Sequence, residues 1–194
     1  VSQTALSTSR DSKGVVVVTA KVDPENVNGR LTALITGRQI SDMLKALESI
    51  PGRAIMELDI QLPEGSGGIS AAIPQDAFES IVLGANRSLR ISAGLGEITL
   101  DNASLKAVQD EADGDIEIRM ALADNDGLPD GIKAEIGDRP VISLGIMSGS
   151  KAITRFNGGM VNVAVPYALR PVEEPGAIVV FHMGDDGSVT PVKA

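Results

Sequence analysis

An oxygen-rich loop is the clearest candidate for metal chemistry in this sequence. It spans residues 124–131 and reads DNDGLPDG, and carboxylate and amide oxygens around a glycine can wrap a hard cation such as calcium. The EF-hand spacing fails, because Leu128 occupies the fifth position counted from Asp124. The candidate metal ligands are therefore Asp124, Asp126 and Asp130, and the competing interpretation is an ordinary Asx-rich turn.

Residues for covalent or acid–base catalysis are few. His182 is the single histidine, and no serine stands in a Gly-x-Ser-x-Gly elbow that it could serve. Paired acids could in principle act on a glycosidic bond, but these pairs fall in predicted loops, turns or a helix face and are expected to be solvated: Asp110-Glu111, Glu173-Glu174 and Asp185-Asp186. We therefore expect no enzyme activity, no catalytic residue and no bound cofactor.

The overall composition bounds the partners and the core. The 194 residues carry a formal net charge of −9, and phosphate binding needs clustered Lys and Arg, so we expect no nucleic-acid partner. The absence of cysteine excludes disulfides and zinc–thiolate sites. No apolar run approaches the roughly 20 residues of a membrane span. With no Trp, one Tyr and three Phe, the chain must pack an aliphatic core and cannot build an aromatic platform for sugars.

Three similar segments predict the elements of the first two-thirds. Each is a short alternating strand followed by apolar residues at helical spacing, at residues 31–40, 69–78 and 96–105. Thr36 and Asp101 are suited to cap the first and third helices, and Pro74 is suited to begin the second. Ile73 and Leu100 close their strands on the inner side, so both should be buried.

Further strands complete the predicted order. One follows each helix, at 54–62, 88–93 and 115–123, and the valine-rich segment 15–22 reads as a central strand buried on both faces. Later strands are expected at 141–147, 151–155, 161–165, 178–183 and 189–192, with a hairpin turn at 184–188.

These elements predict an α+β fold in which strand–short helix units precede a mainly antiparallel, β-sandwich-like portion. We expect a polar or disordered N-terminal tail at 1–13, an α+β portion at 14–123 and a β portion at 138–194 that packs with it as one unit.

Short motifs in the C-terminal third resemble those of a known family. They are Gly137-Asp138-Arg139-Pro140-Val141, Phe156-Asn157-Gly158, Val165-Pro166-Tyr167, the Glu174-Pro175 step and a hydrophobic strand closed by Asp185-Asp186-Gly187. In these motifs the chain is similar to the repeated extracellular module of Gram-positive cell-surface proteins. That module often precedes S-layer homology domains or lies between the domains of secreted polysaccharide-active enzymes.

The resemblance implies a bacterial protein at the cell surface or outside the cell, and it supplies no catalytic positions. It implies a structural or spacer module whose partners are neighbouring domains of a larger chain and cell-wall or extracellular polysaccharide. The alternative is a carbohydrate-binding module that uses polar side chains and calcium. The family continues past the hairpin into further strands, whereas this chain ends at Ala194. We therefore expect the hairpin edge to be covered by the N-terminal tail, a second copy or a further segment.

Overall fold

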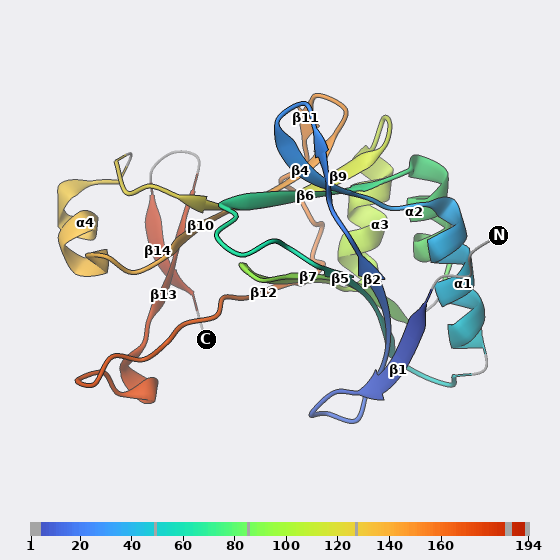
Figure 1. Cartoon of the computed structure of the whole chain (residues 1–194), viewed down its shortest axis with the longest axis horizontal. Helices are drawn as coiled ribbons and strands as arrows, with labels where there is room; N and C mark the ends of the chain where they lie inside the picture. Colours follow the sequence, from blue (N-terminus) through green and yellow to red (C-terminus); the bar gives the residue numbers. More distant parts are fainter. Residues whose placement is uncertain (1–4, 49, 85, 127, 185–187, 193–194) are drawn as a thin grey trace. The chain divides into compact units, whose positions relative to one another are not determined.

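The computed structural model describes residues 5–48, 50–84, 86–126, 128–184 and 188–192, and its fold is a mixture of helices and strands (Figure 1). The chain divides into two compact units. Unit 1 consists of Val1–Leu122 and Ile142–Val165, and unit 2 consists of Ala123–Val141 and Pro166–Ala194.

Unit 1 contains two sheets and three helices. Sheet A has the strand order β1 (Leu6–Arg10), β2 (Val16–Val22), β5 (Ala54–Ile60), β7 (Arg87–Ala93), β8 (Gly96–Leu100) and β12 (Val161–Ala164). Sheet B has the order β11 (Lys151–Ala152), β10 (Val141–Ser148), β9 (Ile116–Ala123), β6 (Gly68–Ile73), β4 (Arg30–Leu34) and β3 (Glu25–Val27). The helices are α1 (Gly37–Glu48), α2 (Gln75–Leu83) and α3 (Asn102–Glu111).

Each helix of unit 1 carries the chain from one sheet to the other. The three predicted segments become β4–α1–β5, β6–α2–β7 and β8–α3–β9. In the first two segments the chain passes from sheet B to sheet A. Their first strands, β4 and β6, are parallel neighbours in sheet B, and their second strands, β5 and β7, are parallel neighbours in sheet A. The third runs from sheet A to sheet B, and its strands pair antiparallel with β7 and β6. The first two segments therefore share one arrangement, and the third reverses it.

Local side chains start the first and third helices as predicted. Thr36 and Gln39 form a reciprocal capping box: Gln39 N donates to Thr36 Oγ1 at 3.2 Å, and Thr36 N donates to Gln39 Oε1 at 2.8 Å. Asp101 Oδ1 accepts from Ser104 N at 2.8 Å at the start of α3. Pro74 precedes α2 without a side-chain cap, which its fixed φ and missing N–H allow.

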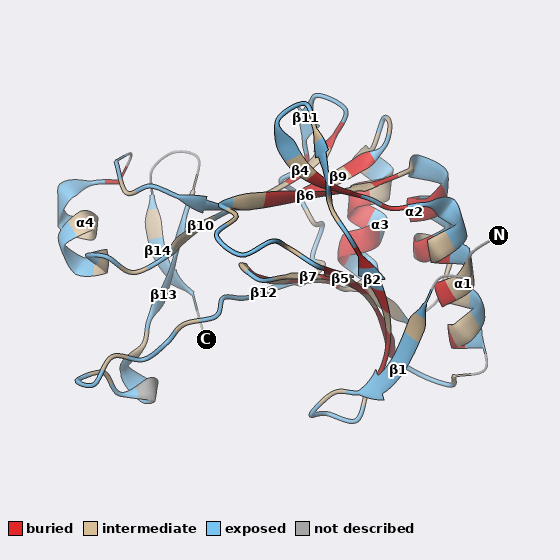
Figure 2. Ribbon diagram, viewed as in Figure 1, coloured by how far each residue is buried: buried red, intermediate tan, exposed pale blue. Residues whose placement is uncertain are grey.

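Aliphatic residues fill a single core that both sheets and all three helices of unit 1 share. Figure 2 shows the buried positions running along β2, β5, β6 and one face of each of these helices. Strand β2, which is the second strand of sheet A and has a neighbour on each side, buries Val16, Val17 and Val18 on both faces, as its composition predicts. Ile73 and Leu100 are each 0% exposed, so their predicted burial is confirmed.

The N-terminal segment differs from the predicted polar tail. Leu6–Arg10 is strand β1 and pairs antiparallel with β2, from Leu6 opposite Ala20 to Arg10 opposite Val16. Its polar sequence fits an edge strand, because only Leu6 of the five residues is not exposed.

The division into units also differs from the predicted boundaries. Residues 142–165 belong to unit 1, where β10 pairs with β9 and β12 pairs with β8. Unit 2 joins residues 123–141 to residues 166–194 instead of forming one continuous C-terminal portion. Its elements are α4 (Asp130–Ile136), the short 3-10 helix η1 (Pro175–Ala177), β13 (Val180–Met183) and β14 (Val189–Val192).

The predicted C-terminal hairpin is present as the antiparallel pair β13 and β14. Its turn residues 185–187 lie outside the described residues. The pair forms a two-stranded sheet of its own among the described strands. In the N-terminal segment, strand β1 pairs with β2.

A close crossing fixes the chain before β12 onto the start of α3. Met160 O accepts from Asp101 N at 3.2 Å and lies 2.9 Å from Ser104 Oγ, which is fully buried. Gly159 passes so near that a Cβ built on it would lie 2.3 Å from Ser104 N. Real Cβ atoms essentially never approach a neighbour closer than 3.0 Å, so this position admits only glycine unless the backbone moves.

Candidate functional site

The three predicted metal ligands do not converge on a common point in the described structure. Asp124 Oδ1 accepts from Asp126 N at 3.2 Å, which is an Asx-turn contact. Asp130 begins α4, and its exposed carboxylate lies 3.9 Å from Lys133 Nζ. Within the described residues, which omit Gly127 of this loop, no three His, Asp or Glu side chains are placed to hold a metal ion. The geometry matches the Asx-rich turn.

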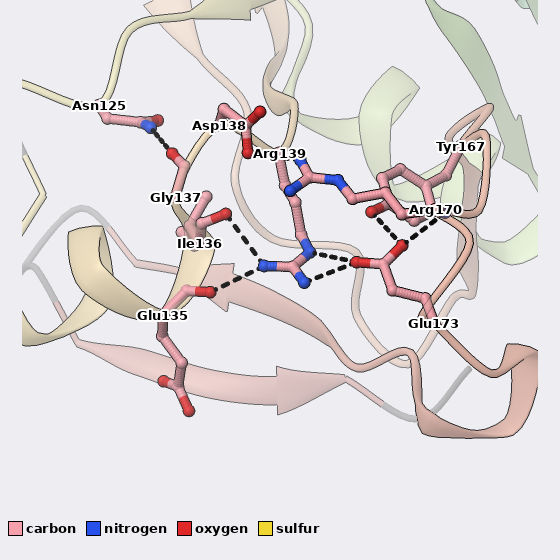
Figure 3. A network of polar contacts seen from close by, with 9 residues as sticks. All are labelled: Asn125, Glu135, Ile136, Gly137, Asp138, Arg139, Tyr167, Arg170 and Glu173. Carbon is pink, nitrogen blue, oxygen red and sulfur yellow. Dashed lines mark hydrogen bonds and ion pairs between the residues drawn. The ribbon is translucent and has the colours of Figure 1, made fainter.

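The most connected polar centre lies instead in unit 2, around the carboxylate of Glu173 (Figure 3). Tyr167 Oη donates to Glu173 Oε2 at 2.6 Å, and the backbone N–H of Arg170 donates to the same oxygen at 3.0 Å. Arg139 donates to Oε1 through Nη2 at 2.6 Å and through Nε at 3.2 Å. The Glu173 side chain is 10% exposed, so four donors hold a carboxylate that is largely shielded from solvent.

Arg139 also caps the C-terminal end of helix α4, and through this contact it links the two stretches of chain in unit 2. Its Nη1 donates to the carbonyl oxygens of Glu135 at 3.0 Å and Ile136 at 3.2 Å, and a cation at a helix C-terminus is favourable. Gly137 ends the helix with a φ of +59°, and its carbonyl oxygen accepts from Asn125 Nδ2 at 2.9 Å. One guanidinium thus ties the last turn of α4 to Glu173.

A second ion pair flanks this centre. Arg170 donates through Nη2 to Asp138 Oδ1, so the neighbouring residues Asp138 and Arg139 each bind a residue of the segment 170–173. We call Asp138, Arg139, Tyr167, Arg170 and Glu173 the clamp.

The electrostatics of the clamp favour a fixed charge over proton transfer. The hydrogen bond from Tyr167, followed by the Arg170 backbone N–H and Arg139, lowers the pKa of Glu173 to about 2. The hydrogen bond from Arg170 likewise holds the pKa of Asp138 below its usual range. A general acid or base works best with a pKa near the operating pH. Glu173 is therefore suited to hold the chain in place and poorly suited to move protons at neutral pH.

Four of the five clamp residues lie in or beside the motifs that carry the family resemblance. Asp138 and Arg139 come from the Gly-Asp-Arg-Pro-Val motif, Tyr167 from the Val-Pro-Tyr motif, and Glu173 directly precedes the Glu-Pro step. In the sequence these residues only mark the resemblance, and Glu173 is predicted to be a solvated acid, whereas its side chain is 10% exposed in the structure. The signal that could have indicated the clamp is that two polar segments each pair an arginine with an acid beside a proline. Asp138 and Arg139 precede Pro140, and Arg170 and Glu173 flank Pro171.

No protein-family model, no curated protein and no solved structure matches this chain.

His182 is exposed on β13, opposite Thr190 of β14. Among the described helices, none has the length and apolar character needed to cross a membrane.

A second set of polar side chains crosses the outer face of sheet A. The register aligns these residues in one row over six strands: Ser7, Thr19, Glu57, Arg90, Thr99 and Asn162. Thr19 Oγ1 donates to Glu57 Oε2 at 2.7 Å, and Arg90 Nη1 lies 3.4 Å from Glu57 Oε1. Arg90 Nε also lies 3.4 Å from Thr99 Oγ1. The centre of the row thus satisfies its own polar groups, which favours a structural role.

Acid is expected to weaken unit 2 through the clamp. The folded state holds the Glu173 carboxylate at a pKa of about 2 against an ordinary value of 4.5. Its contribution to stability is therefore complete above about pH 4.5 and is lost as the pH falls towards about 2. Asp138 acts in the same direction, because its pKa is also lowered. Urea unfolding followed by fluorescence of Tyr167, the single tyrosine, should show a falling midpoint in this range.

Glu173→Gln is the matched control for this titration, because the amide keeps the shape and cannot ionise. The variant should unfold at lower urea concentration near pH 7, and its midpoint should depend less on pH between about 4.5 and 2. A variant with the same pH profile as the parent chain would show that Glu173 does not carry the effect.

Proposed function

We propose that the chain is a non-catalytic structural or spacer module of a bacterial cell-surface or secreted multidomain protein. The observation that carries this proposal is the clamp. Clamp residues from the motifs that carry the family resemblance hold two stretches of backbone together. The carboxylate at their centre, that of Glu173, has a pKa of about 2. Residues that stabilise the backbone in this way are expected in a structural module.

The architecture of unit 1 supports the same role. Its aliphatic core is shared by two sheets and three helices, and large cores of this kind give a stable, cooperative body. In the polar row on sheet A, the side chains at the centre form hydrogen bonds and an ion pair with one another. In this proposal the two sheets of unit 1, which share one core, pack in a β-sandwich-like manner, and the partners are neighbouring domains of a larger chain and cell-wall or extracellular polysaccharide.

The location is tested directly on cells of the source bacterium. Antibodies raised against the purified chain should label intact cells or detect the protein in the culture fluid, while a cytosolic marker protein stays unlabelled. Protease added to intact cells should remove the label. Detection only in the cytosolic fraction after lysis would overturn the proposal.

A further inference from the structure

An open pocket of about 310 Å³ lies in unit 1 where β2 and β5 begin. The register places Arg10 of β1 opposite Val16 of β2, and Val16 opposite Ala54 of β5. Neighbouring strands lie about 4.8 Å apart, so the end of β1, the 13–15 turn and Arg53 just before β5 meet at one edge of the sheet. Arg10, Lys13 and Arg53 all line the pocket.

The pocket collects positive charge on a chain whose formal net charge is −9. No acidic residue lines it. Among the ion pairs of the described residues, none involves Arg10, Lys13 or Arg53. The nearby acid Asp11 is occupied by the turn, because its Oδ1 accepts from Lys13 N and Val15 N at 2.8 Å each. Three cations without carboxylate partners create a local attraction for an anion.

The turn that carries Arg10 and Lys13 is held by hydrogen bonds within residues 10–15. Arg10 Nη1 donates to Gly14 O at 2.8 Å, which holds the arginine over the turn and leaves its other N–H groups available. Asp11 N donates to Val15 O at 3.0 Å, and Gly14 has a φ of +78°. The position of the Arg10 guanidinium is therefore set by a contact with the backbone and does not depend on a ligand.

We propose that this pocket binds an anionic sugar unit, namely a sugar that carries a carboxylate or a phosphate group. Guanidinium groups match carboxylate and phosphate oxygens in paired hydrogen bonds, and an ammonium adds a compact charge. Small-molecule sites typically have volumes of about 300–1,000 Å³, so this pocket has room for one sugar-sized unit. The inference rests on the proposed contact with extracellular polysaccharide and names the site and the chemical class.

The test is an NMR titration of the intact, ¹⁵N-labelled chain with three probes. Glucuronate supplies a carboxylate, glucose 6-phosphate supplies a phosphate, and glucose supplies the same ring without charge. At least one anionic probe should shift the amide signals of residues 10–16, 50 and 52–54, and added salt should weaken the binding. Comparison of the two anionic probes shows which group the site prefers.

Two matched variants locate the charge that matters. Arg53→Gln should weaken binding of the preferred probe about tenfold, because it removes a charge-assisted hydrogen bond. Arg155→Gln makes the same change at an exposed arginine of unit 1 outside the pocket and should leave the affinity unchanged. Well-dispersed spectra verify that both variants fold.

The inference is overturned if neither anionic sugar shifts these signals, if glucose shifts them equally, or if Arg155→Gln weakens binding as much as Arg53→Gln. This result is independent of the antibody experiment. Binding by a protein found only in the cytosol would refute the cell-surface proposal and leave the anion site standing, whereas surface location without binding would do the reverse.

Discussion

Replacing Gly159 with alanine is expected to destabilise unit 1 by about 3 kcal/mol, at the upper end of the usual cost of overpacking. The new Cβ would lie 2.3 Å from Ser104 N, 2.5 Å from Ser104 Oγ and 2.6 Å from Ser104 Cα. These atoms form the first turn of α3 and cannot move aside without breaking the contact between Asp101 and Ser104 N. Chemical unfolding followed by far-ultraviolet circular dichroism measures the effect.

Gly67→Ala is the control for this substitution. A Cβ at Gly67 meets no atom within 4 Å, and its φ lies outside the left-handed region, so the change should alter stability by no more than about 0.5 kcal/mol. Equal unfolding midpoints for the Gly159 and Gly67 variants would mean that the chain does not cross the start of α3 as described.

Truncating either of two core residues, Ile73→Ala or Leu100→Ala, is expected to cost about 2–5 kcal/mol. Both side chains are 0% exposed, and each ends a strand that leads directly into a helix, Ile73 into α2 and Leu100 into α3. Truncation leaves a cavity between sheet and helix that the surrounding core fills only in part. Urea unfolding of unit 1 gives the free-energy difference.

Leu83→Ala is the control that separates the effect of burial on stability from the effect of truncating any leucine side chain. Leu83 is the last residue of α2 and is 79% exposed, so its truncation should change the free energy of unfolding by no more than about 0.5 kcal/mol. If the Leu100 and Leu83 variants lost equal stability, the assigned inner face of the sheets would be wrong.

Elements defined by local chemistry or by burial could be predicted from the sequence. The Thr36 and Asp101 side chains accept hydrogen bonds from backbone N–H groups three residues further along the chain, so the signal lies within one turn. The valines of β2 are buried on both faces, and their uninterrupted apolar run reports this directly.

The parts that escaped prediction lack a hydrophobic signal. Strand β1 is almost entirely exposed, and none of the described residues of α4 is buried, so neither shows an apolar face. The clamp joins Arg139 to Glu173 across 34 residues of sequence. Its partners are polar residues in irregular segments, and only the fold brings them together.

Unit 2 depends on the clamp for a physical reason. Among its described residues, Leu128 is the single buried apolar side chain, and a lone two-stranded hairpin such as β13–β14 is only marginally stable. Polar contacts must therefore hold this unit together to a greater degree than they do in unit 1.

A double-mutant cycle on Arg139 and Glu173 tests this structural role most directly. Arg139→Gln, Glu173→Gln and the double variant are unfolded in urea at neutral pH, with Tyr167 fluorescence as the probe of unit 2. If the two side chains act as one clamp, the double variant unfolds at nearly the same urea concentration as either single variant. If the two shifts in midpoint simply add, the residues act independently and the clamp does not hold unit 2 together.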